Sequence, residues 1–329
     1  MLRQVPPSDV LNLHWLAGLI DYRDFFQRVP VGLPIVWTLH DMNSFTGGCH
    51  YAGACRKFLD SCGCCPQLNS SSSRDFSRAV SRRKRTAYAG LDSDNFVVVT
   101  PSRWLASEAR ESGLMRKFDI NVIPYGLDTQ SFRPRDRAIA RDLLNVPPEA
   151  RVLLFIAQHV GVGYKGLSTL VEAIGRLKGI PNLFLLILGN GQFPLQSTVS
   201  HVSLGFVKEQ RLVSLAYSAA DLFVLPTLRD NFPNTALESM ACGLPIVGFE
   251  TGGVPEIVRD GTTGLLVRPG DTEALVRALD DLLNDSGRRQ QMASNSRQIA
   301  VEEYALEVQA RRYASLYASL IGRSAKKGR

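Results

Sequence analysis

Residues 225–245 read LPTLRDNFPNTALESMACGLP, and the alternation of apolar and polar segments here indicates the fold class. The apolar run from Leu222 to Pro226 predicts a buried strand, and after a polar loop the residues from Thr235 to Cys242 predict a helix. A second apolar run, Pro245 to Phe249, follows at once and predicts the next strand. Strand, loop, helix and strand in this order form the repeating unit of a parallel α/β sheet.

The same alternation continues on both sides of this stretch, from residue 126 to residue 300. The further strands expected are Val152–Ala157, Leu183–Leu188, Val202–Gly205 and Gly264–Val267. The further helices expected are Gly166–Leu177, Glu209–Ser218, Val254–Arg259 and Thr272–Asn284. Residues 126–300 are therefore predicted to form a complete doubly wound domain, with any ligand at the carboxyl ends of its strands.

Residues 1–125 predict half of a second doubly wound domain, entered in the middle of its sheet. The strands expected there are Val10–Trp15, Ile35–His40, Phe96–Thr100 and Ile120–Ile123, and the helices are Tyr22–Arg28, Ser77–Tyr88 and Ser102–Glu111. An irregular insert, residues 41–73, separates the second strand from the second helix. Residues 301–329 predict a C-terminal helix with a basic tail.

The composition is that of a globular protein outside the membrane interior. Of the 329 residues, 45% are hydrophobic and 21% are charged, which excludes a disordered chain. The longest apolar runs are far shorter than the roughly 20 residues of a membrane span, and residues 1–7 do not resemble a signal peptide, so we expect a cytoplasmic protein. The net charge is +7, with one basic run, Arg82–Arg85. That run predicts either a solvated helix face or a contact with an anionic membrane surface, and no nucleic-acid motif accompanies it.

Four residues that follow predicted strands suggest a site for a nucleotide and its phosphates. The backbone amides of Asn234 and Thr235 would open a helix at the sheet edge, where amides bind phosphate. Glu238 lies one turn further on and can accept hydrogen bonds from ribose hydroxyls, and Lys165 precedes a helix and can place its ammonium on a diphosphate. A structural alternative remains open, because Thr235-x-x-Glu238 also has the spacing of a helix capping box.

The ordered set of these motifs resembles a known family. Residues 126–300 resemble the donor-binding domain of the retaining glycosyltransferases of family four, which have the GT-B fold of two Rossmann-like domains. The resemblance rests on Lys165-Gly166, Asp230-x7-Glu238, 241–245 (ACGLP) and 252–256 (GGVPE). The first third is similar to bacterial members that build exopolysaccharide or lipid-linked oligosaccharide, through residues 13–15 (LHW), 37–42 (WTLHDM), 45–51 (FTGGCHY), 65–68 (CPQL) and 101–104 (PSRW).

The resemblance implies a nucleotide-sugar donor, a UDP- or GDP-sugar, held mainly by the second domain. Lys165 would contact the diphosphate, Glu238 the ribose, and the amides of Asn234 and Thr235 would assist. Asp230 takes the place of an acidic residue, usually glutamate, near the donor sugar. The resemblance also implies that no metal is required, since protein groups supply the positive charge.

On the acceptor side, the resemblance implies a growing glycan or a lipid-linked acceptor bound mainly by residues 1–125. His40 would end a strand and match the family's histidine near the reacting sugar, where it could stabilise developing positive charge. A histidine that only satisfies a strand end is the alternative. His40 and Asp230 are thus the catalytic candidates.

Two departures from the family pattern leave other functions open. No arginine occurs between Arg151 and Arg176, so the arginine expected beside Lys165 is missing unless Arg229 replaces it. Loss of one charge-assisted hydrogen bond costs about 1.5–3 kcal/mol. In addition, no glycine-rich loop precedes Val10. The alternatives are a non-catalytic nucleotide-sugar-binding module that acts in assembly and, less favoured, a nucleotide-sugar epimerase.

The insert concentrates thiols. Five of the six cysteines fall within 17 residues, together with His50: Cys49, Cys55, Cys62, Cys64 and Cys65. A structural zinc site would use Cys49, Cys55, Cys62 and Cys65, but their spacings lack the paired Cys-x2-Cys arrangement of common zinc sites. Reduced cysteines that pack in the interior, and disulfides, are the alternatives.

Overall fold

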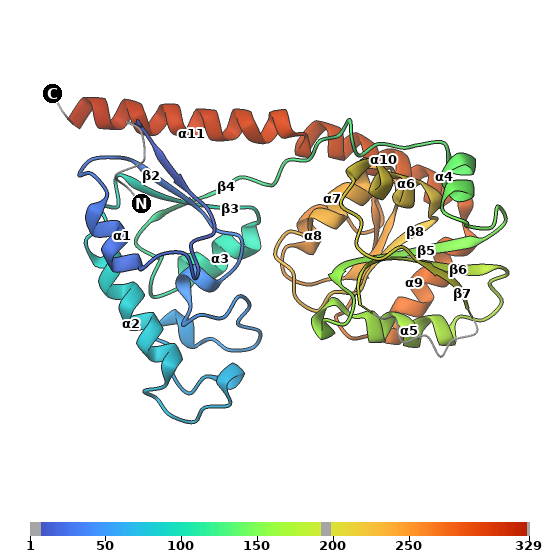
Figure 1. Cartoon of the computed structure of the whole chain (residues 1–329), viewed down its shortest axis with the longest axis horizontal. Helices are drawn as coiled ribbons and strands as arrows, with labels where there is room; N and C mark the ends of the chain where they lie inside the picture. Colours follow the sequence, from blue (N-terminus) through green and yellow to red (C-terminus); the bar gives the residue numbers. More distant parts are fainter. Residues whose placement is uncertain (1–7, 192–198, 328–329) are drawn as a thin grey trace. The chain divides into compact units, whose positions relative to one another are not determined.

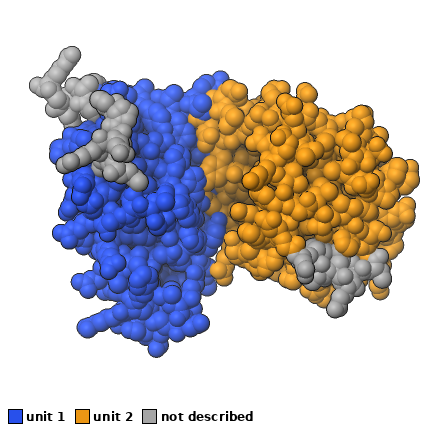
Figure 2. Space-filling model, viewed as in Figure 1, with its two compact units in different colours: residues 1–124, 310–329 blue, residues 125–309 orange. Residues whose placement is uncertain are grey.

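The computed structural model describes residues 8–191 and 199–327, and the chain divides into two compact units. Unit 1 comprises residues 1–124 and 310–329, and unit 2 comprises residues 125–309 (Figure 2). The C-terminal part of the chain is thus divided between the units, because residues 310–329 belong with the N-terminal sheet. No helix in the described part of the chain is both long enough and apolar enough to cross a membrane.

Unit 2 contains a six-stranded, wholly parallel sheet in the order β10-β9-β8-β5-β6-β7. Its strands are β5 (Arg151–His159), β6 (Leu183–Asn190), β7 (Ser200–Ser203), β8 (Leu222–Leu225), β9 (Ile246–Phe249) and β10 (Gly264–Val267). The order reverses direction between β5 and β8, which is the kind of switch point where doubly wound sheets bind ligands. Strands β8 and β9 are buried along their whole length, as their apolar sequences predict.

Helices cover both faces of this sheet (Figure 1). One core packs the sheet against α4 (Arg137–Leu143), α6 (Gln210–Ala219), α7 (Asn234–Ala241), α8 (Val254–Ile257) and α10 (Ser286–Tyr304). A second core packs the other face against α5 (Leu167–Arg176) and α9 (Thr272–Asn284). The prediction of a doubly wound parallel domain is confirmed.

Unit 1 contains a four-stranded parallel sheet in the order β1-β2-β3-β4. The strands are β1 (Leu11–Leu13), β2 (Ile35–Thr38), β3 (Phe96–Thr100) and β4 (Asp119–Val122). One face packs against α1 (Tyr22–Arg28), α2 (Phe76–Ala89) and α3 (Arg103–Glu111), and the other face packs against α11 (Leu306–Lys327) through Leu320. These are the four parallel strands predicted for the partial Rossmann-like domain. The insert between β2 and α2 forms three short 3-10 turns, η2 (Asn43–Phe45), η3 (Lys57–Leu59) and η4 (Pro66–Leu68).

Several predicted bounds need correction. Strand β2 ends at Thr38, so His40 lies two residues beyond it, and β7 spans 200–203 rather than 202–205. Helices α4 and α10 had no predicted counterpart. The C-terminal segment is not one helix from Val301, because α10 ends at Tyr304 and α11 begins at Leu306 after the extended Ala305.

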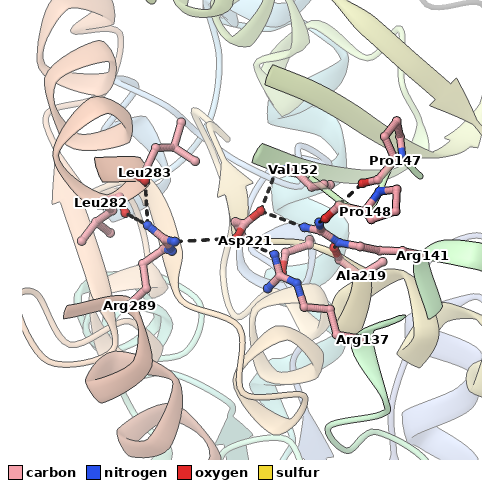
Figure 3. A network of polar contacts seen from close by, with 11 residues as sticks. Arg137, Arg141, Pro147, Pro148, Val152, Ala219, Asp221, Leu282, Leu283 and Arg289 are labelled. Carbon is pink, nitrogen blue, oxygen red and sulfur yellow. Dashed lines mark hydrogen bonds and ion pairs between the residues drawn. The ribbon is translucent and has the colours of Figure 1, made fainter. Parts of the chain in front are cut away.

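A buried ion network holds unit 2 together at the amino-terminal end of β8 (Figure 3). The Asp221 carboxylate lies 2.6 Å from Arg137, 3.1 Å from Arg141 and 3.8 Å from Arg289. It also accepts a hydrogen bond of 2.8 Å from the Val152 amide at the start of β5. Because Asp221 lies at the opposite end of β8 from the loop that leads to α7, this network is structural.

Candidate functional site

Two loops at the carboxyl ends of β5 and β8 lie against each other. The first contains the 3-10 turn η5 (Gly163–Lys165), and its Tyr164 carbonyl accepts a 2.7 Å hydrogen bond from the Leu228 amide of the second. Gly166 has a φ of +78°, and a Cβ at this position would lie 1.8 Å from the Pro226 carbonyl oxygen. Only glycine fits this close approach. The Lys165-Gly166 pair is therefore explained by a contact that brings the lysine to the end of β8.

Lys165 and Asp230 form an ion pair at this junction. Lys165 Nζ lies 2.7 Å from Asp230 Oδ2, with side chains that are 30% and 11% exposed. The Asp230 carbonyl accepts a hydrogen bond from the Gly253 amide, and a Cβ on Gly252 would lie 1.8 Å from the same carbonyl oxygen. The GGVPE stretch thus packs directly against the loop that carries Asp230. The structure brings together the predicted lysine, the predicted acidic residue and the glycine pair.

Helix α7 begins at this loop with open backbone amides. Its N-cap is Pro233, and no side chain caps the helix. The capping-box interpretation of Thr235-x-x-Glu238 is therefore wrong, since Thr235 lies inside the helix and not at the N-cap. Asn234 is exposed and Thr235 is half-buried, so the positive end of the helix dipole is accessible.

Glu238 lies on α7 with one oxygen engaged. Its Oε2 lies 2.9 Å from the hydroxyl of buried Tyr217, which also donates toward the Thr235 carbonyl at 3.1 Å. Burial raises the pKa of the Glu238 carboxyl, and the Tyr217 hydrogen bond opposes this shift. Oε1 accepts no hydrogen bond from the residues that the structure describes, so it can accept one from a ligand. The contact of Tyr217 with Glu238 was not predicted from the sequence, because Tyr217 lies on a different helix, 21 positions away.

Arg229, the predicted substitute for the missing arginine, lies on the same loop and is exposed. Within the described ranges its guanidinium forms no ion pair, so its charge is not committed to another protein group. Cys242, the residue that follows α7, is buried beside Ser214 and belongs to the core of unit 2.

His40 belongs to unit 1 and is half-buried beyond the end of β2. Its Nε2 lies 3.0 Å from Nδ1 of His14, and the two rings stack with centroids 5.3 Å apart. Burial lowers the pKa of both histidines, and His14 lowers the pKa of His40 further while Asp41 opposes this. Both shifts favour the neutral form of the imidazole. His14 was not singled out from the sequence, although it stands in the LHW motif.

Asp41, which follows His40 in the chain, connects the histidine pair to His50 and Trp15. His50 Nδ1 lies 2.8 Å from Asp41 Oδ2, and the His50 ring stacks on Trp15 with centroids 5.2 Å apart. Trp15 is 45% exposed. An exposed indole beside hydrogen-bonding groups is suited to the apolar face and hydroxyls of a sugar ring.

Residues 136–299 match the family model described as "Glycosyl transferases group 1". The chain belongs to this family. The match contains Lys165, Asp230 and the whole of α7, so the part of the candidate site in unit 2 lies inside the family domain.

Curated relatives carry the likeness beyond this domain. The chain is 33% identical over 314 residues to D-inositol 3-phosphate glycosyltransferase of Nocardia farcinica, covering 88% of this chain and 62% of the relative. It is 30% identical over 218 residues to the lipopolysaccharide core biosynthesis glycosyltransferase LpsE of Rhizobium meliloti, covering 64% of this chain and 61% of the relative. A second D-inositol 3-phosphate glycosyltransferase, from Stackebrandtia nassauensis, is 32% identical, with 54% and 44% covered. The chain thus spans less than two thirds of each of these relatives.

Solved structures show that the fold is GT-B. Sucrose-phosphate synthase of Thermosynechococcus elongatus matches with a TM-score of 0.74 at 23% identity, covering 96% of this chain and 74% of that one. HepE of Anabaena, solved with UDP-glucose, matches with a TM-score of 0.64 at 20% identity, covering 87% and 72%. The predicted fold class, α/β with two parallel-sheet domains of GT-B type, is confirmed.

Proposed function

We propose that this group 1 glycosyltransferase is a retaining hexosyltransferase that moves a sugar from a UDP- or GDP-sugar to a growing glycan or a lipid-linked acceptor. The observation that carries this proposal is the Lys165–Asp230 ion pair beside the uncapped start of α7. An ammonium and open helix amides at the switch point of a parallel sheet form a site for a nucleoside diphosphate. The UDP-glucose complex of the structural relative HepE supports the choice of ligand class.

Each side chain has a role that follows from its contacts. Lys165 would contact the diphosphate, and Asp230 would hold the lysine in place and lie near the donor sugar. The amides of Asn234 and Thr235 would bind phosphate oxygens, and Glu238 would accept ribose hydroxyls through its unengaged Oε1.

In the reaction we propose, the bond between the sugar C1 and the diphosphate oxygen breaks, and a bond forms from C1 to the acceptor oxygen on the same face. The negative charge on the leaving diphosphate is neutralised by Lys165 and the amides of α7. The acceptor proton passes to a phosphate oxygen of the leaving group. His40 of unit 1 would contact the reacting sugar and stabilise the positive charge that develops on it.

The acceptor assignment rests on the curated relatives and on charge. LpsE is named for lipopolysaccharide core biosynthesis, and two further relatives are named D-inositol 3-phosphate glycosyltransferase; these names support a hydroxyl-rich acceptor for this chain as well. Arg82 and Arg83 are exposed on α2 and would bind an anionic membrane surface. We therefore propose a cytoplasmic protein that works at the inner face of a membrane.

The test is calorimetric titration of the chain with UDP, GDP, ADP and their sugars, first wild type and then Glu238→Ala. We expect micromolar binding of one nucleotide and a loss of about 10- to 150-fold in the variant, which corresponds to a hydrogen bond to a charged group. Glu302→Ala, an exposed glutamate on α10, is the matched control and should bind as wild type does. Equal affinity in all three proteins would refute the assignment of Glu238.

Transfer is then measured separately with the nucleotide sugar that binds best. Release of nucleoside diphosphate that depends on a glycan acceptor, with the anomeric configuration kept in the product, is the expected result. Donor binding without any transfer would favour the alternative, a nucleotide-sugar-binding module. Free epimerised sugar nucleotide in the absence of acceptor would favour the epimerase.

A further inference from the structure

Four cysteines of the insert line one cavity in unit 1. The cavity has a volume of about 250 Å³, and its wall includes Cys49, Cys55, Cys62 and Cys65. Cys62 is buried and the other three are half-buried. The rest of the wall is largely apolar, with contributions from Ala52, Phe58, Leu68 and Phe76. The fifth cysteine of the insert, Cys64, is not part of this wall, because its Sγ donates to the Ser71 carbonyl at 3.2 Å.

The backbone around the cavity has a close approach and positive φ angles that position the cysteines at its wall. A Cβ on Gly47 would lie 2.4 Å from the Ser77 carbonyl oxygen and 2.9 Å from Cys62 Cβ, so only glycine lets this loop approach Cys62. Gly63 has a φ of +137°, and Cys64 is a non-glycine residue in the left-handed region with a φ of +42°. Strain of this kind is typical of sites with a function. Here it turns the chain sharply between Cys62 and Cys65, so that both face one cavity.

One of the cavity sulfurs accepts a backbone hydrogen bond, and a buried lysine binds the same loop. The Gly47 amide donates to Cys62 Sγ at 3.1 Å, which is the kind of bond that supports metal-bound thiolates. Lys84 Nζ is buried nearby and donates to the Thr46 carbonyl at 3.1 Å.

Neither simpler role accounts for this arrangement. All six cysteines are free, so the structure offers no disulfide. Thiols that served only to fill space would close the interior to normal packing density, but these four border a hollow. In residues 8–191 and 199–327, no three His, Cys, Asp or Glu side chains converge on a single point as ligands of one ion. The four cysteines instead line a common cavity.

We propose that Cys49, Cys55, Cys62 and Cys65 are the four thiolate ligands of a metal centre seated in this cavity. Thiolates select zinc and iron–sulfur clusters. An iron–sulfur cluster would take one thiolate from each of the four cysteines. A single zinc ion would require them to close to about 2.3 Å from the metal. In either case each thiol loses its proton to solvent as its bond to the metal forms. The centre fixes the insert against α2.

The first test measures metal in the full-length chain, purified once in air and once without oxygen. Zinc, iron and acid-labile sulfide are quantified per chain in the wild type and in Cys62→Ser and Cys65→Ser. We expect one zinc, or iron with an equal amount of sulfide, which distinguishes the two centres, and loss of the metal in both variants. Cys64→Ser and Cys242→Ser are the matched controls and should keep it. Equal metal content in all variants would overturn the proposal.

A second test uses only wild-type protein, so it does not depend on whether a variant folds. Reactive thiols are counted in the native chain before and after a strong chelator, and we expect four additional thiols to become reactive. The chelated protein is then titrated with Co²⁺, where a thiolate-to-metal charge-transfer band should saturate at one equivalent. An unchanged thiol count together with no Co²⁺ spectrum would show that the cavity binds no metal.

Discussion

Replacing Asp221 with asparagine is expected to destabilise unit 2 by about 3–5 kcal/mol, the usual effect of breaking a buried ion pair from one side. Both carboxylate oxygens are engaged, Oδ1 by Arg137 and Oδ2 by Arg141 and by the Val152 amide. An asparagine of the same size removes the negative charge and turns one acceptor into a donor that faces a guanidinium. The arginine charges would then remain buried without their partner.

The size of this loss of stability depends on how far each arginine side chain is exposed to water. The side chain of Arg141 is 6% exposed and that of Arg289 is 11% exposed, so water cannot replace the lost carboxylate for these two. Arg137 is 47% exposed and contributes no more than about 1 kcal/mol. For a unit of this size, a loss of 3–5 kcal/mol lowers the midpoint of thermal unfolding by about 10 °C.

The measurement is thermal and urea unfolding followed by far-ultraviolet circular dichroism. All three tryptophans, Trp15, Trp37 and Trp104, lie in unit 1, so their fluorescence reports the other unit separately. Asp281→Asn is the control, because its partner Arg288 and Asp281 itself are 37% and 53% exposed, and it should cost less than about 1 kcal/mol. If both variants unfold within 1 kcal/mol of the wild type, the reasoning from burial is refuted.

Three further predictions address the site, the insert and the surface. Gly166→Ala should weaken nucleotide binding by about tenfold or more, because its Cβ would collide with the Pro226 carbonyl and displace the preceding lysine; an unchanged Kd in calorimetry would contradict this. Burial lowers the pKa of Lys84 to about 8 in the folded chain, against an ordinary value of 10.5. Between these two pH values the unfolded chain binds more protons than the folded chain, so the free energy of unfolding should rise with pH. Relative to Lys84→Met, the rise should be at most about 1.4 kcal/mol per pH unit. Parallel stability curves for the two proteins would disprove that linkage. Reversing the charge of exposed Arg82 and Arg83 to glutamate should reduce sedimentation with anionic vesicles several-fold, and equal binding would remove the case for membrane contact.

Most strands of the two sheets could be predicted from the sequence, because they are short apolar runs. The helices between them have apolar residues at helical spacing. Helices α1 and α9 have the predicted bounds, since each begins after an aspartate N-cap, Asp21 and Asp271. Helix α10 was missed because its residues, SGRRQQMASNSRQIAVEEY, are mostly polar and show no clear apolar stripe. Packing against α7 and the sheet, and not local pattern, determines that helix.

The two sites differed in how far sequence could locate them. Lys165 and Asp230 follow the ends of strands, which parallel topology brings to one edge of the sheet, so their proximity could be inferred. The cysteine cavity could not, because the chain reaches it through 3-10 turns whose spacing follows no repeat. The basic run was also misleading in part: Lys84 points into the insert, and only backbone contacts reveal it.

Helix α11 has a consequence for how the protein is made. Its residues beyond 309 cover Val36, Val97 and Val99 of the N-terminal sheet, yet they are synthesised only after the whole of residues 125–309. During translation, one face of the unit 1 sheet therefore stays uncovered while unit 2 is made. A ribosome that stalls between β4 and α11 leaves this apolar surface exposed for chaperones or proteases to recognise.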